Sequence, residues 1–248
     1  MNNPFSLSGK TILVTGASSG IGKAIACECA RVGAQLVLTA RNNLRLQDTL
    51  SCLDGLGHAV FNADLTNDED LVALVNSLSK LDGIVFCAGI SKPLVLSLTE
   101  KEDVNDTMNT NLLSTINLTR LIIQHKKLNK KASLVFISSI NGNKCSYFGS
   151  SLYASSKAAI DGFMKGVALE LSPREIRANC INPGMIETEL LKKSTIGEEE
   201  LAKDRLKYPL KRYGQPEEVA YAAVYLLSDA SQWITGSSLL IDGGYTLQ

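Results

Sequence analysis

The stretch from residue 10 to residue 32 limits what this chain can fold into more than any other. A short run rich in β-forming residues, KTILVT at 10–15, is followed directly by the turn GASSGIG at 16–22. A strand, a glycine-containing turn and a helix in this order are typical of a phosphate-binding βα unit. The helix is predicted by apolar side chains that recur at helical spacing beyond the turn, namely Ile21, Ile25, Cys29 and Val32.

The three glycines of this turn have distinct expected roles. Gly16 would make the tight turn, while Gly20 and Gly22 would let a pyrophosphate approach the helix N-terminus. Free N–H groups and the positive end of the helix dipole would stabilise the anion there. A glycine turn can also be merely structural, but its place between a strand and a helix favours nucleotide binding.

Strand-like and helix-like stretches alternate along the rest of the chain. The alternation predicts an α/β protein with a single-domain Rossmann fold, a doubly wound, seven-stranded parallel sheet flanked by helices. The further strands are expected at 35–40, 59–65, 82–89, 134–137, 177–182 and 238–244, and the helices at 42–54, 68–80, 100–127, around Tyr153 and Lys157, and 217–227.

We expect one domain over residues 1–248, because no internal repeat, low-complexity tract or linker divides the chain. Its cofactor half would cover about 1–135 and its substrate and catalytic half about 136–248. The polar, helix-prone residues 185–212 would form a mobile flap over a cleft.

Charge and composition exclude several classes of function. Lys and Arg together number 25 and so do Asp and Glu, so no net field attracts nucleic acid or an anionic membrane. The first ten residues lack the apolar core of a signal peptide, and no apolar run is long enough to span a bilayer. Six scattered cysteines without a Cys-x-x-Cys pair, and only two histidines, indicate reduced thiols and no metal site. We therefore expect a cytoplasmic protein.

Residues 138–157 contain the side chains best suited to acid–base chemistry. Tyr153 and Lys157 lie four residues apart in a helix-compatible stretch, which puts both on one helix face. An ammonium stabilises the phenolate form of a neighbouring phenol, so such a pair can transfer a proton near neutral pH. Ser138 or Ser139, at the end of the preceding strand, could hold a substrate oxygen beside the phenol. With seven tyrosines, a Tyr-x-x-x-Lys pair can also arise by chance, and it gains weight only from the nucleotide site before it.

The end of the second strand bears on the choice of cofactor. An NAD-binding protein would place an acidic residue there to hold the ribose hydroxyls. This chain has Ala40 and then Arg41 and Asn42. A planar guanidinium suits a 2′-phosphate, so we predict NADP(H). The alternative is a solvated surface arginine.

These motifs together resemble the short-chain dehydrogenase/reductase family, from about Ser8 to the C-terminus. In the C-terminal half the resemblance is strongest to bacterial 3-oxoacyl-[acyl-carrier-protein] reductases. Cys87 stands where the family usually has asparagine, which weakens one hydrogen-bonding role. The segments that carry the resemblance are TGASSGIG at 15–22, the adenine-side pair Asp64-Leu65, CAG at 87–89, the nicotinamide-side segment NPGMIET at 182–188 and IDGG at 241–244.

The resemblance implies four catalytic residues, Asn111, Ser139, Tyr153 and Lys157. Tyr153 would exchange a proton with the substrate oxygen, Ser139 would bind that oxygen, and Lys157 would hold the nicotinamide ribose. The main-chain carbonyl of Asn111 would position a water. Ser138 stays a second candidate, because the interval from Ser139 to Tyr153 is one residue longer than usual in the family. The implied cofactor-binding residues are Gly16, Ser18, Ser19, Gly20, Ile21, Gly22, Arg41, Asn42, Asp64, Leu65, Ala88, Gly89, Tyr153, Lys157, Pro183, Gly184, Ile186 and Thr188.

The implied function is an NADP(H)-dependent oxidoreductase that transfers hydride between the nicotinamide and a carbonyl or secondary alcohol. The substrate would be a 3-oxoacyl-[acyl-carrier-protein], or alternatively a sugar, a steroid or a small ketone. A non-catalytic dinucleotide-binding sensor is the alternative of another class. The family also suggests a homotetramer, or a homodimer, built on helices near 101–127 and 152–171 and on the C-terminal strand. The basic run HKKLNKK at 125–131 can be explained by the dipole of a helix C-terminus, or by docking of an acidic carrier.

Overall fold

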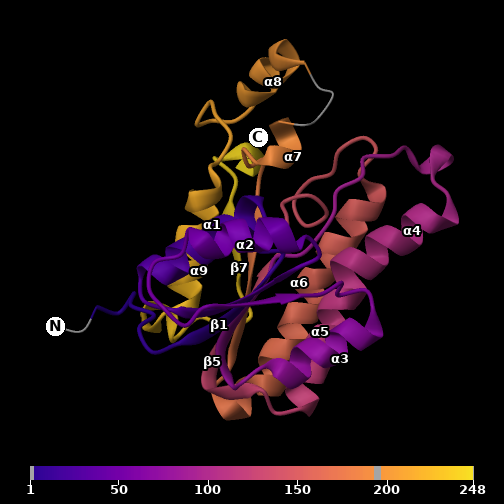
Figure 1. Cartoon of the computed structure of the whole chain (residues 1–248). Helices are drawn as coiled ribbons and strands as arrows, with labels where there is room; N and C mark the ends of the chain where they lie inside the picture. The colour runs from indigo at the N-terminus through magenta and orange to yellow at the C-terminus, as the bar shows by residue number, and fades with distance from the viewer. Residues whose placement is uncertain (1–2, 193–196, 248) are drawn as a thin grey trace.

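The computed structural model of this chain describes residues 3–192 and 197–247. Within these ranges seven strands form one parallel sheet in the order β3-β2-β1-β4-β5-β6-β7 (Figure 1). The strands are β1 Thr11–Thr15, β2 Gln35–Ala40, β3 Ala59–Asn62, β4 Leu81–Phe86, β5 Leu128–Ile137, β6 Arg177–Pro183 and β7 Ser238–Ile241. The predicted doubly wound, seven-stranded parallel sheet is therefore confirmed.

Helices connect the strands and cover both faces of the sheet. The α-helices are α1 Gly20–Arg31, α2 Asn43–Ser51, α3 Asp68–Ser77, α4 Lys101–Met108, α5 Ser114–Gln124, α6 Ser151–Leu171, α7 Glu189–Lys192, α8 Glu198–Arg205 and α9 Pro216–Leu227. Shorter turns are the π-helical η2 Asn109–Leu113 and the 3₁₀ turns η1 Leu96–Leu98, η3 Ser172–Arg174, η4 Asp229–Ser231 and η5 Tyr245–Leu247.

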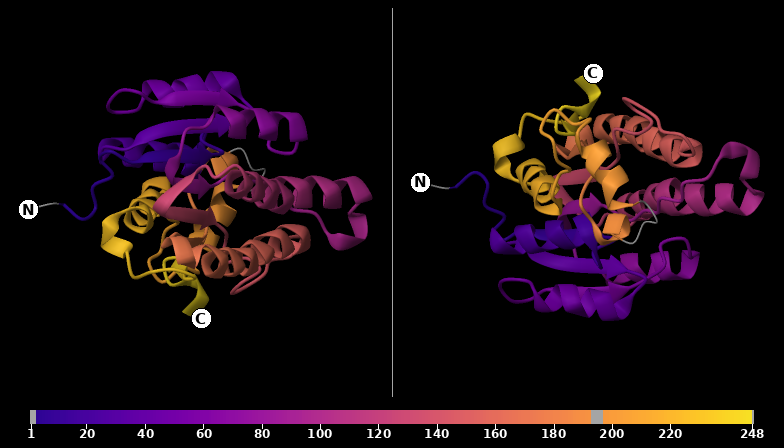
Figure 2. Two further views of the ribbon diagram at one scale, coloured as in Figure 1. Left: turned by 90° about the horizontal axis from the view of Figure 1, so that it is seen from below. Right: turned by 90° about the horizontal axis from the view of Figure 1, so that it is seen from above.

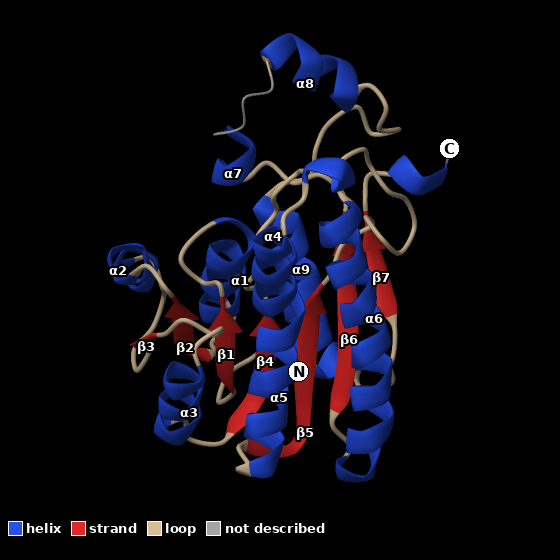
Figure 3. Ribbon diagram, turned by 90° about the vertical axis from the view of Figure 1, so that its right-hand side faces the viewer, coloured by secondary structure: helices blue, strands red, loops and turns tan. Residues whose placement is uncertain are grey.

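The alternation of side chains along each strand builds two cores, one on each face of the sheet. On β5, Val135 and Ile137 join the core under α1 and α9, whereas Leu134 and Phe136 join the core under α3, α5 and α6. Figure 3 shows α3, α5 and α6 in front of the sheet and α9 behind it. In Figure 2 the indigo N-terminal segments lie beside the yellow C-terminal ones, because α1 packs against α9. Burial on both faces explains the nearly continuous apolar runs of the central strands.

Several strands and helices end two to four residues earlier than the sequence predicts, and two elements differ more. The helix expected over residues 100–127 is divided by the π turn at Asn109–Leu113, and it ends at Gln124. The strand expected at 134–137 begins earlier, at Leu128. Residues 185–212, the predicted flap, contain α7 and α8, and part of this segment (193–196) lies outside the described residues. Its mobility stays a prediction.

The order of the strands places a site at the carboxyl ends of the central strands. Chain connections run outward in opposite directions from the neighbouring strands β1 and β4. In such open α/β sheets, ligands bind beyond the carboxyl ends of the strands at this switch point. β1, β4, β5 and β6 all end at that edge, and the glycine turn, the serines and the segment after Pro183 follow directly.

Candidate active site

The glycine turn after β1 is packed so closely that side chains cannot replace two of its glycines. Gly16 has a φ of +65°, and a Cβ there would lie 2.9 Å from the backbone of Ala88. A Cβ on Gly22 would lie 2.3 Å from the carbonyl oxygen of Gly16. The turn, the start of α1 and the turn after β4 therefore meet with bare backbone. This is the cradle that a close-lying pyrophosphate requires.

The N-terminus of α1 differs from those of the neighbouring helices. Among the described contacts, the side chain of its N-cap residue, Ser19, makes no capping hydrogen bond, and its first turn has no acidic residue. By contrast, α3 is capped by Asn67 and has three acidic residues in its first turn. Helix N-termini attract anions through their free N–H groups and the helix dipole. The end of α1 therefore fits a phosphate group of a dinucleotide.

Thr15, the last residue of β1, holds the turn after β4. Its Oγ1 accepts hydrogen bonds from the main-chain N–H groups of Cys87 (3.0 Å) and Ala88 (3.1 Å). The turn is thus fixed through its backbone, and the cysteine in place of asparagine does not disturb it. Burial raises the pKa of the Cys87 thiol to about 11, although the charge of Lys157 opposes this shift. Cys87 is accordingly a neutral thiol at pH 7. Sequence reasoning gave Thr15 no role of its own, although it is the first residue of the TGASSGIG segment at 15–22.

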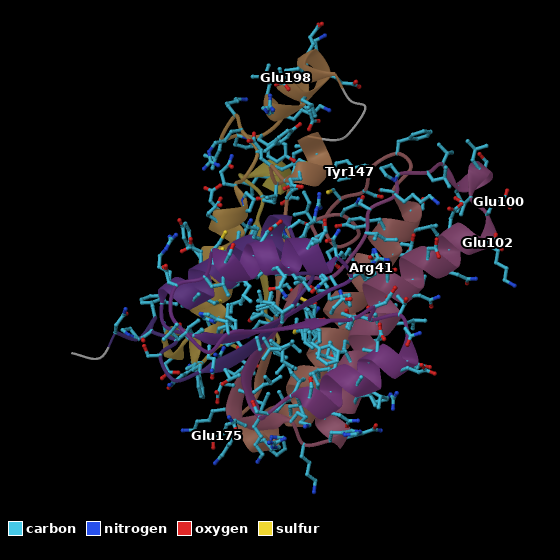
Figure 4. All side chains as sticks on the ribbon, in the orientation of Figure 1. Arg41, Glu100, Glu102, Tyr147, Glu175 and Glu198 are labelled. Carbon is cyan, nitrogen blue, oxygen red and sulfur yellow. The ribbon has the colours of Figure 1, made fainter. Side chains whose placement is uncertain are left out.

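A polar cavity of about 390 Å³ lies beside the end of β2. It is lined by Arg41, Asp64, Thr66, Ile90, Asp106, Asn109 and Thr110. Arg41 is mostly exposed, and its Nη1 lies 4.0 Å from Asp64 Oδ2 (Figure 4). The cavity therefore contains a guanidinium free enough to turn toward a phosphate, next to the predicted adenine-side pair Asp64-Leu65. Asn42 has a further role, because its Oδ1 accepts a hydrogen bond from Arg45 N (3.0 Å) and caps α2.

Asp64 is held as a carboxylate by its own turn. Partial burial would raise its pKa, but hydrogen bonds from the Thr66 main chain and hydroxyl, together with the charge of Arg41, lower it overall. The Thr66 bonds measure 2.9 Å and 2.7 Å. The carboxylate is therefore fixed before any cofactor binds. Leu65, beside it, is buried in the second core.

Tyr153 and Lys157 lie one turn apart on α6, as their spacing predicts. The Nζ of Lys157 is 5.8 Å from the centre of the Tyr153 ring. It also donates a 2.9 Å hydrogen bond to the carbonyl oxygen of Ile137, the last residue of β5. Lys157 is only 6% exposed. A buried ammonium tied to the end of β5 places a fixed positive charge beside the phenol.

The two serines after β5 have different roles. The hydroxyl of Ser138 donates a 2.8 Å hydrogen bond to the main-chain oxygen of Lys157 and accepts one from Asn143 Nδ2 at 3.2 Å. Ser138 therefore joins β5 to α6. The Oγ of Ser139 accepts a hydrogen bond from Asn141 N (3.0 Å), and among the described contacts its own proton is not donated. Of the two candidates, Ser139 is the one with a hydroxyl proton available for a substrate oxygen.

Asn111 lies inside the π turn and connects three segments with its side chain. Its Nδ2 donates to the main-chain oxygen of Ile90 (3.0 Å) and to Ser156 Oγ (3.1 Å), while its Oδ1 accepts from Ile90 N (2.7 Å). A Cβ on Gly89 would lie 3.2 Å from Asn111 Oδ1 and 3.4 Å from Lys157 Nζ. Asn111, Gly89 and Lys157 therefore meet. π turns often occur at functional sites, because they change the pairing of main-chain carbonyls. Neither Ile90 nor Ser156 carries a motif that could have identified it from the sequence.

The segment after β6 crosses the site from the opposite side. Gly184 N donates to Ile241 O (2.8 Å), and a Cβ on Gly184 would lie 3.0 Å from Asp242 Cα. Ile186 forms a bridge with Gly214 and is buried. The side chain of Thr188 reaches the glycine turn, since its Cγ2 would be 3.3 Å from a Cβ on Gly20. The predicted nicotinamide-side residues thus lie over the phosphate cradle.

A dinucleotide cradle joined to a Tyr–Lys–Ser–Asn cluster at the carboxyl edge of a parallel sheet defines the site of a nicotinamide-dependent oxidoreductase. Residues 16–246 match the family model described as enoyl-(acyl carrier protein) reductase. The chain belongs to the short-chain dehydrogenase/reductase family.

Two similar proteins and one solved structure agree with this assignment. A 3-oxoacyl-[acyl-carrier-protein] reductase of Thermotoga maritima is 34% identical over 97% of this chain and 99% of its own length. Carbonyl reductase family member 4 of Danio rerio is 35% identical over 95% of this chain and 97% of its own. A dehydrogenase/reductase from Sinorhizobium meliloti 1021 superposes with a TM-score of 0.90 at 32% identity, covering 98% of this chain and 97% of the other.

The described ranges show neither a membrane-spanning helix nor a metal-binding cluster. None of their helices combines the length and apolar character that crossing a bilayer requires. Nor do residues 3–192 and 197–247 contain a group of three or more His, Cys, Asp or Glu side chains that could hold a metal ion.

Proposed function

We propose that this chain is an NADP(H)-dependent reductase of carbonyl compounds, which interconverts a carbonyl and a secondary alcohol. The observation that carries the proposal is the buried ammonium of Lys157, fixed one helical turn from Tyr153 and at the same sheet edge as the phosphate cradle. The bound nicotinamide would supply or accept the hydride. The rest of the chemistry belongs to the residues of this chain.

Each residue of the cluster has a part that its geometry supports. Tyr153 donates the proton that the carbonyl oxygen takes up, and accepts it in the reverse direction. Ser139 donates a hydrogen bond to that oxygen as negative charge develops on it. Lys157 favours the phenolate that remains after proton transfer. The main-chain carbonyl of Asn111, in the π turn, accepts a hydrogen bond from Thr115 Oγ1 at 3.5 Å and would also hold a water in the proton path.

The preference for NADP(H) rests on Arg41. Its guanidinium lies beside the polar cavity at the end of β2, and Ala40 presents no carboxylate that would repel a 2′-phosphate. Charge-assisted hydrogen bonds to that phosphate are worth about 1.5–3 kcal/mol, or about 10- to 150-fold in affinity. Two carboxylates, those of Asp64 and Asp106, also line the cavity, and hydrogen bonds from Thr66 direct that of Asp64 into its own turn.

The test compares kcat/KM for NADPH and NADH in the parent and in Arg41→Ala. We expect the parent to prefer NADPH and the substitution to weaken NADPH about 10- to 150-fold, with little effect on NADH. Arg120→Ala, at an exposed position on α5, is the matched control for loss of a positive charge. A parent that prefers NADH, or equal losses with both cofactors, would overturn the cofactor assignment.

Among carbonyl substrates, a 3-oxoacyl thioester is the first to test, because a similar protein of nearly equal length is named for that activity. Sugars, steroids and small ketones are the alternatives. NADPH consumption against a panel of these compounds would identify the substrate class. Tight NADPH binding without turnover of any of them would favour a dinucleotide-binding sensor instead.

The basic cluster proposed for carrier docking lies at the opposite end of the strands from Tyr153. It consists of Lys126, Lys127, Lys130 and Lys131. β5 begins beside this cluster, and its ten residues cover about 30 Å before the chain reaches Ser138 and Ser139. Lys130 and Lys131 also pair with Glu175, at 2.5 Å and 3.7 Å; Figure 4 labels this glutamate at that end of the molecule. A carrier bound there can serve only the active site of another copy of the chain.

We also propose that the chain forms a homotetramer or a homodimer. Apolar side chains are exposed on the elements where the family assembles, namely Leu113 on η2, Leu169 on α6, and Leu239 and Leu240 on β7. Exposed apolar groups on neighbouring elements favour contacts between protein subunits. Sedimentation equilibrium would measure the assembly, and a monomer at micromolar concentration would contradict it.

A further inference from the structure

The C-terminal turn after β7 is held rigidly although it lies at the end of the chain. Asp242 accepts hydrogen bonds from Gly244 N (2.9 Å), Thr246 N (2.9 Å) and Thr246 Oγ1 (2.7 Å). These bonds, which outweigh the opposing effect of burial, lower the pKa of Asp242. The carboxylate therefore keeps the turn closed at neutral pH. The turn presents one aromatic ring, that of Tyr245.

Both ends of the segment 185–212, called the flap here, rest on this C-terminal turn. At the start, Gly184 N donates to Ile241 O at 2.8 Å. At the far end, Leu210 N donates to Gly243 O at 3.3 Å. Gly244 has a φ of +84°, and a Cβ on it would lie 2.9 Å from the ring of Pro209, so the backbone of Gly244 packs closely against that ring. Figure 1 shows α7, α8 and the C-terminus together at this end of the molecule.

Tyr245 contacts two tyrosines that come from different segments. Its ring centre is 4.8 Å from that of Tyr208, at the end of the flap, and 6.0 Å from that of Tyr147. Tyr147 belongs to the loop of residues 140–150, called the catalytic loop here because it connects Ser139 to the helix of Tyr153. Figure 4 shows Tyr147 at the end of the molecule where α7 lies. Tyr245 is thus the aromatic connection between the flap and the catalytic loop.

The two partners of Tyr245 are themselves fixed. Tyr208 is 2% exposed, packs edge-on against Tyr213 at 5.5 Å, and accepts a hydrogen bond from Met185 N at 3.3 Å. Burial raises its pKa to about 12, so its ring stays neutral. Tyr147 accepts a hydrogen bond from Cys145 Sγ at 3.5 Å, and its main-chain N–H donates to Ser150 Oγ at 3.1 Å. A shift of Tyr245 would therefore change its packing against both Tyr208 and Tyr147.

Two further contacts of the nicotinamide-side segment do not involve Tyr245 or its partners. Glu187 N donates to Gly214 O at 2.8 Å, and Gly214 N donates to Met185 O at 3.0 Å. These two bonds hold Ile186 and its neighbours to the start of α9. The cofactor side of the flap therefore keeps these two bonds when Tyr245 is replaced, although Met185 N also bonds Tyr208.

We propose that Tyr245 is a positioning residue, which sets the separation of the catalytic loop and the flap and thereby the fit of the carbonyl substrate. The two segments carry exposed apolar side chains, Phe148 on the loop and Leu206 and Leu210 on the flap. The substrate class that fits is a carbonyl compound with an apolar chain or ring. The substrate part of this inference rests on the proposed reductase function, whereas the positional part does not.

Hydrogen exchange measured by mass spectrometry tests the positional part without any substrate. In Tyr245→Ala we expect exchange about tenfold faster in residues 143–150 and 198–210, because two aromatic pairs are lost. Tyr245→Phe keeps the ring and should match the parent. Tyr221→Ala, at an exposed position on α9, is the matched control. Unchanged exchange in Tyr245→Ala, or an equal rise throughout the chain, would overturn the proposal.

Steady-state kinetics tests the substrate part. Tyr245→Ala should raise KM for a carbonyl substrate with an apolar chain about tenfold, with the Kd of NADPH unchanged and normal values restored in Tyr245→Phe. An equal loss of NADPH affinity would show a general disturbance of the site and overturn the role in substrate fit. If the parent reduces no carbonyl compound, the proposed function and the substrate part fail together, and hydrogen exchange still decides the position of Tyr245.

Discussion

The catalytic centre and the segments that cover it are held by different kinds of interaction. Asn111 and Lys157 are at most 6% exposed, and their polar atoms meet buried main-chain partners. The flap is held by exposed ion pairs, such as Arg45 with Glu189 at 3.3 Å and Arg212 with Glu218 at 2.6 Å, and by the rings around Tyr208.

The two parts of the molecule therefore differ in the free energy that the loss of one contact costs. A buried polar group left without its partner costs about 1–3 kcal/mol, whereas an exposed ion pair contributes about 0–1 kcal/mol. The geometry proposed for proton transfer is therefore rigid, whereas the contacts that hold the flap cost less to break. Three substitutions test this difference in rigidity, and they follow in decreasing order of expected effect.

The largest effect is expected at Tyr153. Tyr153→Phe removes the hydroxyl that transfers the proton but keeps the ring beside Lys157, so kcat should fall about 10²–10⁴-fold. The Kd of NADPH and the free energy of unfolding should change little. Steady-state kinetics and fluorescence titration with NADPH provide these values, with Tyr221→Phe as the control. Near-normal turnover in Tyr153→Phe would remove the basis of the mechanism.

An intermediate effect is expected at Asn111, where the contrast predicts a loss of stability as well as activity. Asn111→Leu leaves the main-chain N–H and C=O of Ile90 without their side-chain partner, so the free energy of unfolding should fall by about 1–3 kcal/mol for each group left unpaired. Urea unfolding measures the change. Asn105→Leu, at an exposed position on α4, should have little effect. Equal stability of the two variants would show that the centre around Asn111 and Lys157 is no more rigid than the flap.

The smallest effect is expected at Glu218, at the base of the flap. Hydrogen bonds from Arg212 and from Gln215 N lower its pKa from about 4.5 to about 2. Because the folded state binds this proton less readily than the unfolded state, Glu218 stabilises the fold fully above pH 4.5. The contribution decreases as the pH falls from about 4.5 toward 2.

Glu218→Gln should therefore lower the free energy of unfolding at pH 7 by on the order of 1 kcal/mol or less, since solvent screens the pair. The difference from the parent should shrink by pH 3. Glu217→Gln shares the first turn of α9 and controls for the helix dipole. Urea titrations at pH 7, 5 and 3 would show the trend, and a difference that grows in acid would contradict it.

Local patterns predicted much of the fold and part of the site. The periodicity of apolar residues identified the alternating strands and helices, because period 2 and period 3.6 are properties of the backbone itself. The spacing of Gly16, Gly20 and Gly22 predicted the cradle. The four-residue interval from Tyr153 to Lys157 predicted their shared helix face, because neighbours on a helix are close in sequence.

Contacts between distant segments could not be predicted in the same way. The sequence left Ser138 and Ser139 as rivals, and they were distinguished only by the packing of β5 against α6, which engages one hydroxyl with Lys157. The family resemblance implied a catalytic role for Asn111 but not its contacts, whereas the fold shows a π turn in which its side chain binds Ile90, 21 residues earlier.

The sequence by itself thus determined the α/β class, the phosphate-binding turn and the Tyr–Lys pair, because each depends on residues within a turn or two of one another. The tertiary structure decided which serine engages Lys157 with its hydroxyl, at which end of the strands the basic cluster lies, and that Tyr245 meets Tyr147 and Tyr208. These features depend on segments that are brought together only when the sheet closes its two cores. Burial and long-range pairing determine such contacts, so the spacing of residues along the chain cannot predict them.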